Sequence, residues 1–236
     1  MNKIFKIGLV SIAIFVAIIA ILVAVINVAN NNKKFFSYPS EFHYIYLDGG
    51  RYKAAADELA KQVQNRSGAG IVQASNMFEV LCFMYENTSD AEKVKDSLKK
   101  QGLEAMVGVI KMEQLNLKVK RKMRDDRDFR QLLQCFPKNF YIIYDLVCDY
   151  DKGAIAESAV YVRMRQMYMD LLDKGVRSRD GLSGVLLQYI SRFKVAMEEF
   201  VCGKQDEPTS AVLKQLCFYN IMWYNEAVLT INSMHV

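Results

Sequence analysis

The sequence predicts an all-α protein, in which an N-terminal transmembrane helix precedes an antiparallel helical-hairpin array or bundle of seven to nine helices. Only 3 Pro and 12 Gly occur in 236 residues, and such a composition favours helix. Apolar residues recur at steps of three and four through most of the chain, as expected for helices with one buried face. No alternating run bounded by turns indicates a sheet.

The N-terminus consists of a short tail at residues 1–6 and a predicted signal anchor at residues 7–29. In the first twenty residues of the anchor the only clearly polar side chain is Ser11. Twenty helical residues span about 30 Å, the thickness of the hydrocarbon core of a bilayer. This run is longer than the apolar region of a cleaved signal peptide, and Asn27–Ala29 fit a cleavage site poorly. We therefore expect an uncleaved anchor that contacts the lipid bilayer.

The side of the membrane on which the domain lies depends on two signals. Lys3 and Lys6 precede the anchor and Lys33 and Lys34 follow it; with the terminal amine, the positive-inside rule favours a cytoplasmic N-terminus and an extracytoplasmic domain. The five cysteines favour the reverse, because an odd number leaves one unpaired in an oxidising compartment. Each lies among apolar residues, so we interpret them as buried small hydrophobic side chains. The expected localisation is the membrane, single-pass, with the domain outside the cytoplasm.

Residues 30–40 are a predicted linker, and residues 41–236 an all-helical domain whose first part, 41–116, has repeat-like features. Phe42–Leu47 is a short apolar segment that a turn signal, Asp48-Gly49-Gly50, brings to an end. Helices are expected after it at 52–64, 74–85, 90–100 and 103–116.

The second part of the domain is predicted to contain four longer helices. They are expected at 139–150, 153–174, 182–201 and 210–231. Pro137 is expected to stop the apolar segment before the first of them. The third has the clearest amphipathic pattern, with apolar residues at steps of three and four over five turns. The last is apolar nearly all round, which indicates a central, buried helix or one pressed on a partner.

One segment resembles a known repeat. Tyr46, Gly50, Tyr52 and Ala55 follow the spacing of the tetratricopeptide repeat, in which a glycine turn and a small alanine let two helices approach. Leu59 fits the pattern loosely, and no second copy is clear. The resemblance covers about 25 residues and implies a stacked helical array with a groove for peptide segments.

Catalytic and metal-binding signatures are not found in the sequence. There is no Walker A, Rossmann, nucleophile-elbow or zincin motif, and no two cysteines have zinc-ligand spacing. The only histidines are His43, which we interpret as structural, and His235 near the end of the chain. We expect no cofactor, no metal and no small-molecule ligand, and we interpret the protein as not an enzyme.

Two surfaces are candidates for contact with a partner. The first is a basic run over residues 118–130, with net charge +4 from seven basic and three acidic side chains. A solvated helix face explains such a run; contact with an anionic surface is the sharper interpretation. The second candidate is the exposed part of the last helix. The residues concerned are Lys118, Lys120, Arg121, Lys122, Arg124, Arg127, Arg130, Trp223 and Tyr224.

The sequence therefore predicts a membrane-tethered helical interaction module, a scaffold or accessory subunit that holds a protein partner at a membrane or envelope assembly. The alternative is a membrane-bound helical enzyme with scattered carboxylates that acts on a lipid-like or polymer substrate. A third interpretation is a structural subunit of a larger complex, with residues 210–231 buried against neighbours.

Overall fold

The computed structural model describes residues 38–122, 126–172, 181–203 and 206–234. These residues all belong to one unit, which begins at Tyr38. Four of its segments are strands: β1 (Glu41–Asp48), β2 (Ile71–Ala74), β3 (Phe78–Tyr85) and β4 (Ala105–Lys111). The helices are α2 (Lys53–Asn65), α3 (Thr88–Lys100), α4 (Leu117–Lys122), α5 (Arg127–Asp151), α6 (Glu157–Leu172), α7 (Gly181–Val201) and α8 (Thr209–Ser233).

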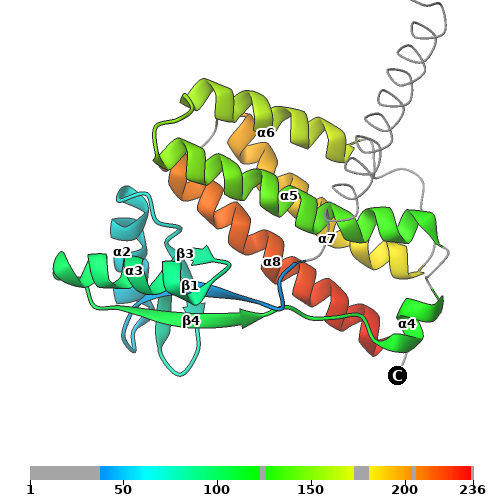
Figure 1. Cartoon of the computed structure of the whole chain (residues 1–236), viewed down its shortest axis with the longest axis horizontal. Helices are drawn as coiled ribbons and strands as arrows, with labels where there is room; N and C mark the ends of the chain where they lie inside the picture. The colour runs from blue at the N-terminus through cyan, green and yellow to red at the C-terminus, as the bar shows by residue number, and fades with distance from the viewer. Residues whose placement is uncertain (1–37, 123–125, 173–180, 204–205, 235–236) are drawn as a thin grey trace, which may run out of the picture. The chain divides into compact units, whose positions relative to one another are not determined.

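The prediction of an all-α protein was therefore wrong. The four strands form one antiparallel sheet in the order β2-β3-β1-β4. With α2 between β1 and β2, and α3 between β3 and β4, the first half of the domain has a split β-α-β topology. The second half is helical, and Figure 1 shows α5 to α8 lying together on one side of the sheet.

Two segments that were predicted to be helices are strands, and the amino-acid composition of each segment explains why. The segment 74–85 fits helical spacing, but within it Val80–Tyr85 is also a continuous apolar run of six residues that includes two aromatic side chains. Such a run is typical of a strand buried on both faces. The segment 103–116 contains Ala105–Lys111, where two valines and an isoleucine surround Gly108, a composition that favours a strand over a helix.

The prediction of a membrane anchor has to be corrected as well. Along the described parts of the chain, no helix is both long enough and apolar enough to cross a bilayer. The predicted anchor at residues 7–29 and most of the linker at 30–40 lie outside the described residues. The described part of the chain therefore does not bear out the predicted single-pass membrane localisation, and the lipid contact expected of residues 7–29 stays a prediction.

Several predicted helices are confirmed within a few residues. They are 52–64, 90–100, 182–201 and 210–231, which correspond to α2, α3, α7 and α8. The helix predicted at 139–150 is longer, because α5 starts at Arg127 and continues through Pro137. The turn and helix that resemble a tetratricopeptide repeat lie in a different setting: Tyr46 is in β1, and Gly50 has a positive φ of 75° in the turn before α2.

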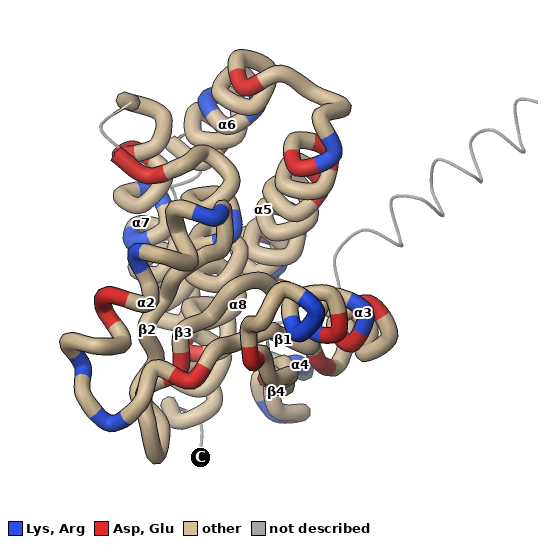
Figure 2. The backbone as a smooth tube through the Cα atoms, turned by 90° about the vertical axis from the view of Figure 1, so that its left-hand side faces the viewer, with Lys and Arg blue, Asp and Glu red and all other residues tan. Residues whose placement is uncertain are grey.

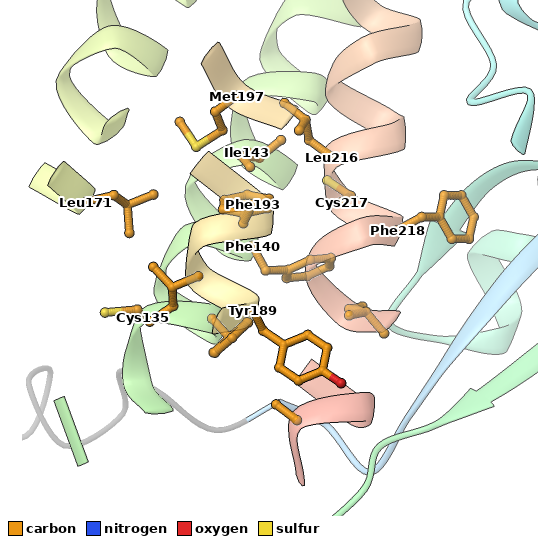
Figure 3. Packing of buried hydrophobic residues seen from close by; sticks show 14 of the residues in the cluster. Cys135, Phe140, Ile143, Leu171, Tyr189, Phe193, Met197, Leu216, Cys217 and Phe218 are labelled. Carbon is orange, nitrogen blue, oxygen red and sulfur yellow. The ribbon is translucent and has the colours of Figure 1, made fainter. Parts of the chain in front are cut away.

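The sheet is covered on both faces. On one face, Leu47 and Val80 pack against the small side chains of α2, Ala56 and Ala60. On the other, the helical half packs through aromatic rings, with centroids 4.9 Å apart for Phe42 and Phe140, 5.5 Å for Phe83 and Tyr144, and 6.5 Å for Tyr44 and Phe218. Figure 3 shows Phe218 projecting from α8 toward the strands. One continuous apolar core therefore joins the sheet to the helices.

The polar side chains of α8 hold the sheet half of the molecule. Near its start, the buried Lys214 ammonium donates to Asp151 at 2.6 Å and to the Ser67 carbonyl at 2.8 Å, and it lies 5.2 Å from the centre of the Phe83 ring. Gln215 donates to the Ala69 carbonyl at 2.9 Å. The helix that was predicted to be central is therefore the element that ties both halves together.

Candidate functional site

The predicted basic surface is divided between two helices. Lys118 and Lys120 are exposed on α4, and Arg127 and Arg130 are exposed at the start of α5. Arg124 lies outside the described residues, and the side chains of Arg121 and Lys122 are not among those described. The anionic contact of this surface stays a prediction.

The predicted contact residues on α8 are half-buried. The Trp223 ring stacks on Tyr219 with centroids 5.2 Å apart and meets Phe193 edge-on at 6.2 Å. The Tyr224 ring packs edge-on against Tyr38 at 4.9 Å, and burial raises the pKa of Tyr224. The Trp223 ring therefore packs against α7 and the Tyr224 ring against the residue that precedes β1.

The one described histidine has a structural environment. His43 is 8 % exposed, and its Nε2 lies 3.0 Å from the Thr88 hydroxyl and 3.7 Å from a carboxylate oxygen of Glu41. In a catalytic triad the acid meets the nitrogen opposite to the nucleophile, whereas here both groups lie nearest the same nitrogen. Within the described ranges, no group of three His, Cys, Asp or Glu side chains could hold a metal ion.

A pocket of about 310 Å³ between α7 and α8 contains carboxylates. Glu199, Asp206 and Glu207 line it together with Tyr219, and these two glutamates contribute to the raised pKa of Tyr219, after burial. Glu207 accepts a hydrogen bond at 2.8 Å from Gln215, which also holds the Ala69 carbonyl. Glu207 thus takes part in the junction between the two halves of the molecule.

The outer edge of β4 is a second and different kind of site. Strand β4 is paired only with β1, and Figure 1 shows it running along the outside of the sheet. The Met112 amide donates to the Ser40 carbonyl at 2.9 Å, so the even-numbered residues of this strand face β1. Because antiparallel pairing alternates, the backbone groups of odd-numbered residues point outward, away from the sheet.

At the end of the strand and beyond it, two asparagines of α8 bond the backbone. Asn225 donates to the Lys111 carbonyl at 3.0 Å and accepts from the Glu113 amide at 2.9 Å. Asn232 repeats the arrangement on the Gln114 carbonyl and the Asn116 amide, at 3.0 and 2.9 Å. Each side-chain amide therefore acts as a short piece of a neighbouring strand, and the edge is closed from the Lys111 carbonyl onward.

Within β4 itself the edge is open. The Ala105 amide is used locally, because it donates to the Leu103 carbonyl at 3.1 Å. Six outward groups make no hydrogen bond to any other described residue: the carbonyls of Ala105, Val107 and Val109, and the amides of Val107, Val109 and Lys111. Val109 is 48 % exposed. The strand carries one charge, Lys111, and no proline, so it lacks most of the features that protect an edge from pairing.

A groove of about 750 Å³ lies along the first half of this edge. Its lining comes from both faces of the sheet: Tyr46 and Met106, paired in register, share one face, and Val107 and α3 lie on the other. It therefore follows the edge itself. On the α3 side, Lys95 pairs with Glu92, whereas Lys99 has no ion-pair partner within the described ranges. Both signs of charge occur along α3 (Figure 2).

This site could not be recognised in the sequence as long as residues 103–116 were predicted to be a helix. The signal was present in Ala105–Lys111, a run of apolar residues with valines on both sides of a glycine. Comparisons of the chain with protein-family models, with curated proteins and with solved structures gave no match.

Proposed function

We propose that the protein is a protein–protein interaction module that binds an extended segment of a partner by adding a strand to the open edge of β4. The observation that carries the proposal is the row of six outward backbone groups on Ala105–Lys111 without a partner in the described structure. A strand laid along them would gain backbone hydrogen bonds, the usual source of affinity in strand addition.

The groove beside the edge supports this function, because side chains of an added strand point alternately to the two faces of the sheet. Those on one face would enter the space of about 750 Å³ between β4 and α3, near Lys99. The exposed apolar side chains of Met106 and Val109 lie on opposite faces of the same edge. The site thus offers both backbone pairing and apolar contact.

An enzyme is the alternative function, and the acidic pocket between α7 and α8 is the feature that favours it. Its carboxylates lie near one tyrosine, but no serine, threonine, cysteine or histidine is among the described residues that line it. Glu207 is already hydrogen-bonded to Gln215 in a contact between the two halves of the molecule. The β4 edge therefore supports a function better than this pocket does.

The proposal is tested by photo-crosslinking in cells that produce the full chain. A benzophenone amino acid replaces Met106, which is 39 % exposed at the edge. We expect one discrete covalent adduct, which Val109→Pro abolishes because proline removes an outward donor and leaves the β1 ladder intact. The matched control is the same benzophenone at Val162, 70 % exposed on α6. An adduct that Val109→Pro leaves unchanged, or equal labelling from Val162, would count against strand addition.

A further inference from the structure

We propose that the strand added to β4 is β4 of a second copy of this chain, paired antiparallel about a two-fold axis at Gly108. This inference rests on the proposed function, because it names the occupant of the same edge. It makes a continuous sheet in which the two β4 strands lie side by side.

The open backbone groups are self-complementary about that axis. Val107 lies opposite Val109 of the second copy, so that each pair exchanges two hydrogen bonds, as outward-facing residues of antiparallel strands do. Ala105 lies opposite Lys111 of the second copy, where the open Lys111 amide meets the open Ala105 carbonyl. The other two groups of this pair are not needed, since the Ala105 amide is bonded to Leu103 and the Lys111 carbonyl to Asn225. All six open groups are therefore paired and none is duplicated.

Neighbouring registers do not achieve this. An axis at Val107 leaves the Val109 carbonyl and the Lys111 amide without partners, because the groups opposite them are engaged within the chain or not outward-facing. An axis at Val109 leaves the Val107 amide and the Ala105 carbonyl unpaired, since the Lys111 carbonyl and the Glu113 amide are bonded to Asn225. The hydrogen bonds made inside the chain thus select Gly108 as the centre.

The side chains of the two β4 strands are compatible with the register centred on Gly108. Met106 lies opposite Ile110 of the second copy on one face, and Val107 opposite Val109 on the other, so apolar side chains meet apolar ones. The two Lys111 side chains lie at opposite ends of the paired segment and do not face each other. At the axis, a Cβ on Gly108 would lie 2.3 Å from the Tyr44 ring, so the ring already covers this position on its own sheet face.

Sedimentation equilibrium of the full chain tests the stoichiometry. We expect a reversible dimer, and Val109→Pro is expected to raise its dissociation constant at least about 100-fold, because each copy loses a donor at the centre of the interface. Val109→Lys is expected to weaken the dimer similarly, whereas Val162→Lys, an equally drastic change at an exposed valine of α6, leaves it unchanged. Circular dichroism confirms that each variant is folded.

Cysteine pairing tests the register in a Cys202→Ser background, since Cys202 is the exposed native thiol among the described residues. A mixture of the Val107→Cys and Val109→Cys variants is expected to form an intermolecular disulfide at least about 10-fold faster than either variant alone. Directly opposite residues have Cα atoms about 5.5 Å apart, whereas diagonal ones are about 7–8 Å apart and too distant for a disulfide.

Three results would overturn the second copy as occupant: a monomer at every concentration, a dimer indifferent to Val109→Pro, or equal disulfide rates in the mixture and the single variants. The proposed function is separate from these outcomes. If the chain is monomeric but Met106 crosslinks to a different protein in a way that Val109→Pro abolishes, strand addition stands and the self-pairing is wrong.

Discussion

At the scale of single residues, the Cys82 thiol on β3 makes stability depend on pH. Burial raises its pKa from 9.0 to about 12, and the nearby Lys214 ammonium opposes the shift only in part. Between these two values the unfolded chain loses the proton while the folded protein keeps it. The free energy of unfolding should therefore fall as pH rises above about 9, by up to about 1.4 kcal/mol per pH unit from this group.

The Cys82→Ala variant tests this pH dependence. It should show a smaller loss of stability than the wild type between pH about 8 and about 10 in urea unfolding. Cys202→Ala is the matched control, because Cys202 is exposed in the folded protein and its replacement should leave the slope unchanged. Equal slopes for the wild type and Cys82→Ala would contradict the assignment of the effect to Cys82.

At the scale of elements, the two asparagines of α8 match the segment after β4 because two distances agree. The distance between the asparagines along the helix is close to the distance between the backbone segments that they bond. Asn225 and Asn232 are seven residues apart on a helix, which is about 10.5 Å. The centres of the backbone segments they hold are three residues apart in an extended chain, which is about 10 Å. Each amide can therefore bond one carbonyl and one N–H without strain in either element.

Replacing Asn225 by leucine should open this end of the edge. We expect a loss of about 1–3 kcal/mol in the free energy of unfolding, because one carbonyl and one amide lose their partners. Hydrogen exchange at the Glu113 amide should accelerate, while exchange at the Asn116 amide, held by Asn232, should change less. Equal acceleration at both amides would show that the two asparagines do not act as separate contacts.

The length and apolar pattern of each element explain which elements could be predicted from the sequence and which could not. Helix α7 was predicted within a few residues because its apolar residues recur at helical steps over five turns, and α8 because its apolar residues continue over too long a segment for a strand. Strand β3 was missed because a short apolar run fits both the helical and the strand period, and its pairing with β1 and β2 decides between them. The open edge could not be predicted locally, since the outward direction of Val107 and Val109 follows from the register between β1 and β4.

At the scale of the whole molecule, α8 joins two halves that are far apart in sequence. Its N-terminal part holds the loop before β2 through Lys214 and Gln215. Its C-terminal part holds the segment after β4, and Figure 1 shows that segment running beside the end of α8. Between them, Phe218 packs on Tyr44 of the sheet. The edge that we propose as the binding site is therefore positioned by the helical half.

This arrangement predicts that the sheet and the helices unfold together. Phe140 on α5 is fully buried and contacts Phe42 of β1 with ring centroids 4.9 Å apart. Phe140→Ala should lower the free energy of unfolding by about 3–5 kcal/mol, because it leaves a cavity in the core shared by both halves. Fluorescence of Trp223, the single tryptophan of the chain, reports on the helices, and hydrogen exchange of the β1 amides reports on the sheet.

Both probes should give the same urea midpoint in the wild type, and the variant should shift both midpoints equally, since two-state unfolding makes transitions coincide. An exposed replacement, Val195→Ala on α7, should shift neither by much, because that side chain is 60 % exposed. Suppose that Phe140→Ala lowered the urea midpoint measured by Trp223 fluorescence but left the midpoint measured by hydrogen exchange of the β1 amides at its wild-type value. The two halves would then be separate folding units. In that case α8 would hold together two halves that unfold separately, and binding at β4 would stabilise the sheet without stabilising the helices.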